Sequence, residues 1–302
     1  MNRFENVSRP LKWSMALLLA VLVVGCGKDP ILGTGAAGSG VVAPPVDPGL
    51  LAPFGIASAG GITNVNSTTV TKVNGNVVMA PNDFCNGVAV GTTNDFGPCN
   101  VSGQQPTNNP GDTVITQTWN GTGPDTTTAD AVMVELLAKW NSTSPAGLPG
   151  GTVLGCGIIG SGGGAGALIG CSGNSTLPPG VYISATASTI GVAGTLTLNG
   201  GPTDVWVFQA PSAALTTATN STILLTGGAI ASNVWWHVGS SATLGTGTTF
   251  NGSVLASASI SMLALATSCG RLLSGAEGSG AFVFESNIVS VPGHASAPPG
   301  CQ

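Results

Sequence analysis

The stretch from residue 179 to residue 289 most constrains the fold, because its apolar residues occur in short runs separated by Gly, Asn, Ser and Thr. Runs such as 205–210 and 234–238 are only a few residues long, and helical periodicity is absent. Short strands at close, even spacing with turn residues between them are typical of an all-β protein or a β-solenoid. We therefore expect a mostly β chain.

Several of these runs alternate apolar and hydroxyl residues, as in 195–198 (TLTL) and 259–261 (SIS). Successive side chains of a strand point to opposite faces. The Leu and Ile residues are therefore expected to point inward and the Thr and Ser residues outward. This pattern predicts a surface of small hydroxyl side chains.

The composition limits the partners of such a surface. Only 6% of the 302 residues are charged, against about 25% in an average soluble domain. The formal net charge is −5, and four of the seven basic residues follow Lys12. Phosphate binding needs clustered Lys and Arg, so nucleic acid is not an expected partner.

Residues 1–26 have the features of an export signal. Arg3, Arg9 and Lys12 form a basic start, and the apolar stretch 15–24 is too short to span a bilayer comfortably. An ordinary cleaved signal or a short membrane anchor would explain these features.

The signal ends in the sequence VVGC, which resembles the lipobox of bacterial lipoproteins. This resemblance implies that Cys26 is lipidated and becomes the mature N-terminus. Gly27 stands where some lipoproteins carry the Asp that holds them at the inner membrane. We therefore expect an exported lipoprotein at the outer membrane or cell surface, with the periplasmic side as the alternative.

Gly and Pro then mark a linker, and the pattern of strands resumes near Phe54. One amphipathic helix is expected over about 127–142, because Val132, Leu136, Leu137 and Trp140 fall on one stripe. The expected organisation is a signal peptide (1–26), a flexible linker (27–53), a β-solenoid domain (54–292) and a C-terminal tail (293–302).

Six cysteines follow Cys26, an even number that favours disulfides in an exported chain. Proximity in the sequence suggests the pairs Cys85–Cys99 and Cys156–Cys171, which leaves Cys269 to pair with Cys301. Sequence alone does not fix this connectivity.

The sequence offers no pattern for a metal, a cofactor or catalysis. Its two histidines, His237 and His294, are not at metal-ligand spacing. The acidic residues are scattered rather than paired. We therefore expect no cofactor and no enzyme activity.

Several motifs, in order, resemble the microbial ice-binding protein family. They run from FGIASAGGIT (54–63) through PGVY (179–182), GTLTL (194–198), VWVFQ (205–209), LTT (215–217) and NVWWHVGSSAT (233–243) to GR (270–271). The resemblance covers roughly 54–292. It implies a right-handed, discontinuous β-solenoid of triangular cross-section with one long α-helix packed along one face. It also implies that another, flat face binds ice.

The chain departs from the family pattern at two places. One is the Gly-rich insertion bracketed by Cys156 and Cys171, whose role the sequence does not reveal. The other is 261–265 (SMLAL), where relatives often carry Thr or Asn. We expect the regular outward pattern to break down in this second segment.

An ice-binding surface must be flat, regular and free of strongly hydrated charges. Same-face residues recur about every 6.6–7 Å along a strand and strands about every 4.7 Å across a sheet. Thr is also a good strand former on any face, so its presence alone does not identify the site. Our candidates for ice contact are Thr63, Thr69, Thr71, Thr216, Thr219, Thr243, Thr246, Ser257, Ser259 and Ser261.

The leading hypothesis is a monomeric protein that adsorbs to the ice crystal surface and is held at the membrane through Cys26. It would inhibit ice growth or recrystallisation, or anchor the cell to ice. The alternative is an adhesin or structural β-solenoid that binds a glycan or another cell.

Overall fold

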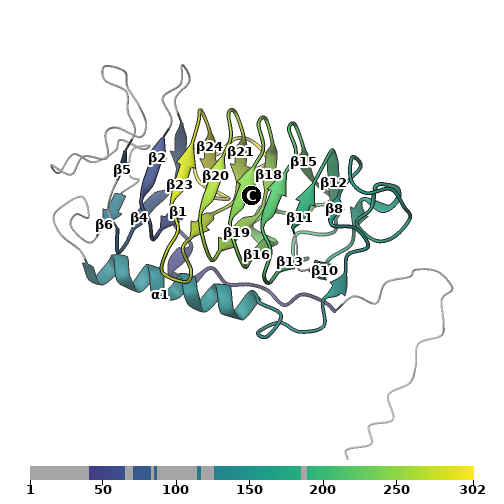
Figure 1. The fold of residues 1–302 in the computed structure, drawn as a ribbon, viewed down its shortest axis with the longest axis horizontal. Coiled ribbons are helices and arrows are strands. Elements are labelled where there is room, and N and C mark those ends of the chain that lie inside the picture. The colour runs from purple at the N-terminus through teal and green to yellow at the C-terminus, as the bar shows by residue number, and fades with distance from the viewer. Residues whose placement is uncertain (1–40, 65–70, 83–84, 87–113, 117–125, 185–188) are drawn as a thin grey trace, which may run out of the picture. The chain divides into compact units, whose positions relative to one another are not determined.

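The computed structural model describes residues 41–64, 71–82, 85–86, 114–116, 126–184 and 189–302 (Figure 1). They form three parallel sheets, one α-helix and three short 3-10 helices. All the strand pairs among these residues are parallel. From β1 to β3 and from β7 to β24, successive strands of the chain pass from sheet A to sheet B to sheet C, so each of these coils contributes one strand to each sheet.

The strands are named here in their spatial order within each sheet. Sheet A contains β6 (Val114–Thr116), β4 (Asn76–Met79), β1 (Phe54–Ser58), β22 (Leu272–Ser274), β19 (Ser253–Ala256), β16 (Val234–Val238), β13 (Trp206–Ala210), β10 (Gly180–Ile183) and β7 (Thr152–Val153). Sheet B contains β5 (Cys85–Asn86), β2 (Ile62–Asn64), β23 (Phe282–Phe284), β20 (Ile260–Met262), β17 (Ala242–Leu244), β14 (Leu215–Thr217), β11 (Ile190–Val192) and β8 (Ile158–Ile159). Sheet C contains β3 (Lys72–Asn74), β24 (Ile288–Ser290), β21 (Thr267–Cys269), β18 (Thr249–Asn251), β15 (Thr222–Thr226), β12 (Thr195–Asn199) and β9 (Thr176–Leu177).

The solenoid is discontinuous along the chain. Strand β1 pairs with β22, with Ile56 opposite Leu272, so the first coil of the sequence stacks on the last. The chain continues away from this junction through β4 and β6, and the helix α1 (Thr126–Thr143) then runs back along sheet A (Figure 1). The remaining coils are built from β7 at the far end toward β22.

One apolar core fills the space between the three sheets. Trp236 from sheet A, Leu244 from sheet B and Phe250 from sheet C belong to the same buried cluster. Aromatic rings stack from coil to coil: the ring centroids of Phe208 and Trp236 are 4.0 Å apart, and those of Tyr182 and Phe208 are 5.4 Å apart. The expected fold class, a mostly β solenoid with one helix along one face, is confirmed.

The helix, expected over about 127–142, extends from Thr126 to Thr143. Its residues Val132 and Leu136 are buried in a second apolar cluster, between α1 and sheet A. The indole Nε1 of Trp140 donates a hydrogen bond to the carbonyl oxygen of Val238 at 3.1 Å. Leu137, which we placed on the same stripe, is 40% exposed and lies at the edge of the contact.

Residues 41–53 belong to the folded body. The backbone N–H of Val181 donates to the carbonyl oxygen of Val41 at 3.2 Å. Ala43 and Leu51 are buried against sheet A, and Gly49–Leu51 forms the 3-10 helix η1. The linker expected over 27–53 is therefore too long at its C-terminal end, because these apolar side chains pack beside the helix.

Two of the expected disulfides are present, Cys156–Cys171 and Cys269–Cys301. Cys99, the expected partner of Cys85, lies outside the described residues. The remaining 3-10 helices are η2 (Ser172–Asn174), beside the first disulfide, and η3 (Ala231–Asn233). In the described part of the chain, no helix has both the length and the apolar character needed to cross a membrane.

Candidate binding surface

The outer face of sheet A is covered. Val181, Val207, Trp235, Leu255 and Leu273 point outward from its strands and are buried in the same cluster as the apolar residues of α1. Polar contacts add to this packing at the C-terminal end of the helix. The Nε2 of Gln209 donates to the carbonyl oxygens of Thr143 and Leu148, at 3.0 and 2.8 Å.

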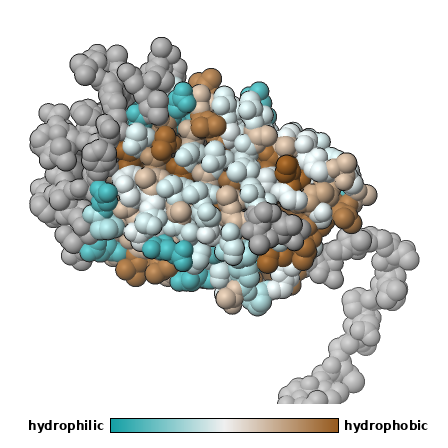
Figure 2. All heavy atoms as spheres, in the orientation of Figure 1, coloured by the Kyte–Doolittle hydropathy of each residue, from teal (hydrophilic) through white to brown (hydrophobic). Residues whose placement is uncertain are grey.

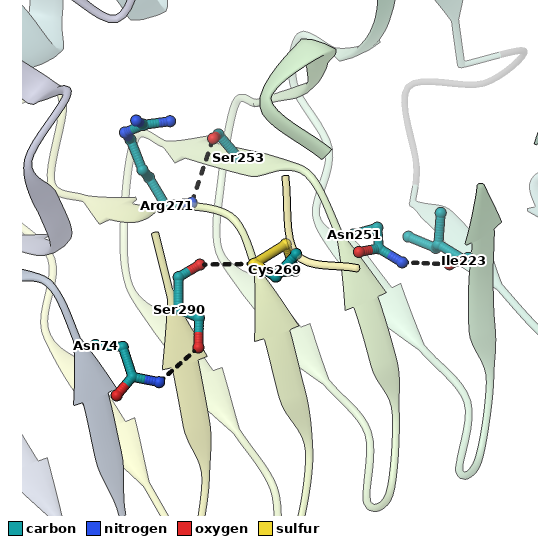
Figure 3. Close-up of a disulfide and its surroundings, with 8 residues drawn as sticks. Asn74, Ile223, Asn251, Ser253, Cys269, Arg271 and Ser290 are labelled. Carbon is teal, nitrogen blue, oxygen red and sulfur yellow. Dashed lines mark hydrogen bonds between the residues drawn. A yellow bond between two sulfur atoms is a disulfide. The ribbon is translucent and has the colours of Figure 1, made fainter. Parts of the chain in front are cut away.

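The outer face of sheet C is partly covered by the C-terminal tail. The disulfide Cys269–Cys301 joins the tail to β21 (Figure 3), and the N–H of Ser232 donates to the carbonyl oxygen of Gln302 at 3.1 Å. Residues 298–301 line a cavity of about 370 Å³ together with residues of β18 and β21. The tail therefore stands over the middle strands of this sheet.

Sheet B is the face that neither the helix nor the tail covers among the described residues. Its outward positions form one row in register across seven strands. In spatial order the row is Thr63, Val283, Ser261, Thr243, Thr216, Gly191 and Ile158. At the usual spacing between strands this row is roughly 29 Å long. Every side chain in it is exposed or half-exposed; Gly191 has none.

A second row of small residues runs beside the first. Backbone hydrogen bonds place Ser259 beside Ser241 and Ala281, through Ala242 N to Ser259 O (2.9 Å) and Ile260 N to Ala281 O (3.0 Å). The whole row, in spatial order, is Gly61, Ala281, Ser259, Ser241, Ala214 and Thr189. The two rows lie about 7 Å apart, because same-face residues alternate along a strand. Together they form a regular two-dimensional array of side chains that are small except for Val283 and Ile158.

The array carries no charge, because none of the described strands of sheet B contains Asp, Glu, Lys, Arg or His. Much of the surface in view over the strands in Figure 2 is pale, the colour of residues of intermediate hydropathy such as Gly, Ser and Thr. Such a surface offers hydroxyl groups and methyl groups at fixed spacing. It can order water or contact a regular solid surface, and it has no group for acid–base chemistry.

Buried hydroxyl groups brace the edge of sheet B that adjoins sheet C. Thr217 Oγ1 lies 2.7 Å from Thr248 Oγ1 and accepts the N–H of Gly245 at 2.7 Å. Ser221 Oγ lies 3.3 Å from Thr248 Oγ1 in the next coil and donates to the carbonyl oxygen of Ala218 at 2.8 Å. Buried hydrogen bonds of this kind are costly to break, so they hold the turn in one position.

The structure brings together five of the ten candidate residues. Thr63, Thr216, Thr243 and Ser261 lie in the first row, and Ser259 lies in the second. The Oγ of Ser259 also accepts the N–H of Ala281 at 3.1 Å, which ties two coils together.

The other candidates lie elsewhere. Thr219 and Thr246 are in the turns that follow sheet B, and both are accessible. Thr71 and Ser257 were expected to point outward, and this expectation is wrong because both are buried. Thr71 Oγ1 donates to Asn64 Oδ1, and Ser257 Oγ donates to the carbonyl oxygen of Gly239. Thr69 lies outside the described residues.

The members of the array that carry no hydroxyl group were not predicted from the sequence. Val283, Gly191 and Ile158 occupy the first row, and Ala281 and Ala214 occupy the second. Val283 and Gly191 each follow an inward apolar residue, and Ile158 begins a strand. Only the register across the strands shows that these three residues share one row. A row of threonines on sheet C, formed by Thr195, Thr222, Thr249 and Thr267, was also not among the predicted candidates.

The regular pattern breaks down after Ser261, as expected. Leu263 is 42% exposed, and Leu265 is 59% exposed with a φ of 63°. At the position that corresponds to Thr248, this coil has Ala266, which cannot join the buried hydroxyl row. Asn287 from the next coil compensates, because its Nδ2 donates to the carbonyl oxygens of Leu263 and Ala266 at 2.8 and 3.2 Å.

The perturbed ionisable groups lie away from the array. Burial lowers the pKa of His237 to about 4, against a smaller opposing effect of its hydrogen bond with the Trp140 carbonyl. Burial also lowers the pKa of Arg271 to about 10; its guanidinium donates to the carbonyl oxygens of Leu51 and Ala52. Within the described residues, no three His, Cys, Asp or Glu side chains are grouped so that they could hold a metal ion.

The protein is therefore a β-solenoid in which α1 covers sheet A, the C-terminal tail partly covers sheet C, and the uncharged array on sheet B stays open. The family profile described as Ice-binding-like matches residues 56–279. The chain therefore belongs to this family, as the sequence motifs indicated.

Individual relatives agree with this assignment. An ice-binding protein of Nostoc sp. (strain HG1) is 46% identical over 121 residues, which is 39% of this chain and 42% of that protein. An ice-binding protein of Flavobacterium frigoris (strain PS1) is 33% identical over 41% of this chain and 42% of that protein. The matched region thus spans about two fifths of the length of these curated relatives.

Solved structures share the fold over almost their full length. The crystal structure of an ice-binding protein from an Antarctic biological consortium superposes with a TM-score of 0.61 at 26% identity, covering 86% of this chain and 96% of that one. An ice-binding protein from an Arctic yeast gives a TM-score of 0.65 at 23% identity, over 84% and 96%.

Proposed function

We propose that this protein adsorbs to ice crystals through the outer face of sheet B and thereby inhibits ice growth or recrystallisation, or holds the cell against ice. The observation that carries the proposal is the open, in-register array of uncharged and mostly small side chains on this sheet. Ice-binding names among its relatives and structural neighbours support it.

A flat crystal surface selects for the features of this array. Water molecules in ice have fixed positions, so a binding surface must hold its own contact groups in fixed positions. Strand pairing does this for the backbone, and short side chains lose little conformational entropy when they are immobilised. A Lys or Glu side chain would lose more and would have to shed tightly bound water.

The first test places bulky rings in the centre of the first row. Thr216→Tyr/Thr243→Tyr should abolish the shaping of ice crystals and the inhibition of recrystallisation, because the rings stand above the plane. Stability should change little, since both side chains lie on the surface. Purified protein lacking residues 1–26 would be assayed for recrystallisation, ice-affinity partition and thermal unfolding.

The matched control is Val134→Tyr, which adds a ring to the exposed side of α1, where the native side chain is 69% exposed. Its activity should equal that of the parent. Full activity in the double variant would remove sheet B as the ice-binding face, and an inactive parent would refute ice binding itself.

We further propose that the protein acts as a monomer and as a binding protein rather than an enzyme. Family membership and the uncharged surface support this view. Light scattering of the active protein would test the first part: a dimer that dissociates with loss of activity contradicts it. Hydrolase activity toward a panel of glycosides and esters would contradict the second part.

The sequence also supports a proposal for localisation, that a lipid on Cys26 holds the exported protein at the outer membrane or cell surface. The support is the VVGC motif after an apolar stretch. Labelled palmitate should enter the parent but not Cys26→Ser, and the parent should fractionate with membranes. Labelling of both proteins, or of neither, would contradict the proposal.

A further inference from the structure

Sheet C carries more outward threonines than sheet B. Thr195, Thr222, Thr249 and Thr267 occupy one row in register across four neighbouring strands. Sheet B has no run of four threonines, because Val283 and Ser261 separate Thr63 from Thr243. If threonine content alone decided which face meets a flat surface, sheet C would be the stronger candidate.

The C-terminal tail prevents a flat approach to this row. It leaves β24 at Val291, and Ser296 and Pro298 border one cavity with Lys72, Asn74 and Ile288 on sheet C. Further along, Pro298, Pro299 and Gly300 border the larger cavity with Thr249 and Thr267. Both prolines are exposed, so they project outward above the sheet. A rigid planar partner would touch them before it reached the threonines.

The tail is held mainly at its end. The cavity of about 370 Å³ shows that Pro298 and Pro299 do not pack closely onto Thr249 and Thr267. It is attached to the solenoid by the disulfide Cys269–Cys301 and by the hydrogen bond from Ser232 N to Gln302 O (3.1 Å), whereas the bond from Gly293 N to Cys301 O (3.0 Å) lies within the tail. Cys301 itself is 6% exposed (Figure 3 shows the disulfide beside Ser290). Loss of the covalent link therefore removes the strongest restraint on the tail.

We propose that residues 293–302 form a strap, held by a disulfide, that masks a second ice-binding face, the threonine row of sheet C, and so confines the protein to one working face. This inference rests on the proposed function, because it assigns to sheet C the partner that sheet B takes. The strap acts by standing above the threonine row as a steric block.

The test uses a parent in which sheet B no longer works, Thr216→Tyr/Thr243→Tyr. Adding Cys269→Ser/Cys301→Ser releases the strap and should restore inhibition of recrystallisation and partition into ice. Adding Thr195→Tyr/Thr222→Tyr to the released protein should remove the regained activity, which assigns it to sheet C. The matched control opens the other disulfide, Cys156→Ser/Cys171→Ser, and should restore nothing.

A second release variant deletes residues 293–302 and carries no cysteine substitution. Cys269 remains as a free thiol, because its partner Cys301 is deleted. Thermal unfolding shows whether each variant is folded. Activity in either released variant that is lost on adding Thr195→Tyr/Thr222→Tyr supports the strap. Folded but inactive released variants overturn it, and so does failure of both to fold, because the tail would then be part of the fold rather than a cover.

The outcomes separate this inference from the proposed function. Ice binding through sheet B is tested by the activity of the native protein, in which both faces and the strap are intact. The strap is tested only by the activity of variants that also carry Thr216→Tyr/Thr243→Tyr on sheet B. If the native protein binds ice and the released variants are folded but inactive, only the strap is refuted. If the native protein does not bind ice and the released variants do, only ice binding through sheet B is refuted.

Discussion

The outer faces of sheets A and B differ although the same coils build both. In one coil, Trp235 points outward from β16 and Thr243 points outward from β17. Trp235 is completely buried under α1, whereas Thr243 stays half-exposed. The backbone is a parallel strand in each case. The outward side chain therefore decides whether a face becomes part of the interior or remains a surface.

The difference separates stability from binding. A buried tryptophan removes roughly 150–250 Å² from water, worth about 5 kcal/mol at the usual coefficient for apolar area. A half-exposed threonine contributes far less. Sheet A and the core therefore hold the solenoid together, and sheet B is free to carry residues selected for contact with another surface.

The largest expected effect on stability is that of the substitution Trp235→Ala. The cavity beneath α1 should lower the free energy of unfolding by about 3–5 kcal/mol. Ice activity per folded molecule should not change, because sheet B keeps its register. Denaturant unfolding and recrystallisation assays at a temperature where the variant is folded would measure both.

Trp235→Phe is the control for this substitution. The buried Nε1 of Trp235 has no hydrogen-bond partner among the described groups, so phenylalanine loses packing but no hydrogen bond. The cost should stay below that of Ala, at most about 3 kcal/mol. Loss of ice activity in folded Trp235→Ala would show that the two faces are coupled. It would contradict the view that sheet A serves stability and sheet B serves binding.

A smaller effect is expected from the pH dependence of the covered face. The Nδ1–H of neutral His237 donates to the carbonyl oxygen of Trp140 at 2.9 Å, and their rings lie 4.6 Å apart. Burial lowers the pKa of His237 to about 4 in the folded protein, below its usual 6.5. The unfolded state therefore binds more protons as the pH falls from about 6.5 to about 4, and stability decreases over this window, by at most about 3 kcal/mol.

The contribution of His237 can be isolated with His237→Gln, because the carboxyl groups titrate in both proteins. The difference in unfolding midpoint between parent and variant should change across this pH window and stay constant above it. Ice activity of the folded parent should be independent of pH in the same range, since the described strands of sheet B hold no Asp, Glu or His. A constant difference in midpoint would show that His237 is not the group responsible.

Much of the fold could be predicted from the sequence, because periodicity and turn residues report on local structure. The alternation in 195–198 correctly separates inward from outward residues, and the apolar stripe locates α1. The family motifs supplied what periodicity cannot, that the solenoid is discontinuous, and the structure showed that the first coil stacks on the last. The end of the linker was missed because Ala43 and Leu51 lie in apolar runs of only three residues, which prolines interrupt.

The candidate site was less predictable, since it depends on which face stays open. Thr249 on sheet C and Thr243 on sheet B look alike in the sequence, and only the tail and helix distinguish their surroundings. Thr71 and Ser257 look like outward strand residues but are buried at corners, where their hydroxyls satisfy neighbouring backbone or amide groups. Coverage and corner hydrogen bonds are long-range properties that local spacing does not encode.

The smallest expected effect sharpens the open face itself. Val283 stands between Thr63 and Ser261 in the first row and contributes only methyl groups. Val283→Thr keeps the shape of the side chain and adds a hydroxyl, which extends the hydroxyl-bearing part of the array. Inhibition of recrystallisation should rise modestly, and the free energy of unfolding should change by no more than about 0.5 kcal/mol.

The same substitution at Val289 is the control, because Val289 is fully buried in the core. There the hydroxyl has to leave water, so Val289→Thr should cost about 1–3 kcal/mol without raising activity. If Val283→Thr lowers activity instead, methyl groups and not hydroxyls provide the favourable contact at this position. The array of sheet B would then work mainly through its flatness and its apolar spacing, and hydroxyl content would not distinguish sheet B from sheet C.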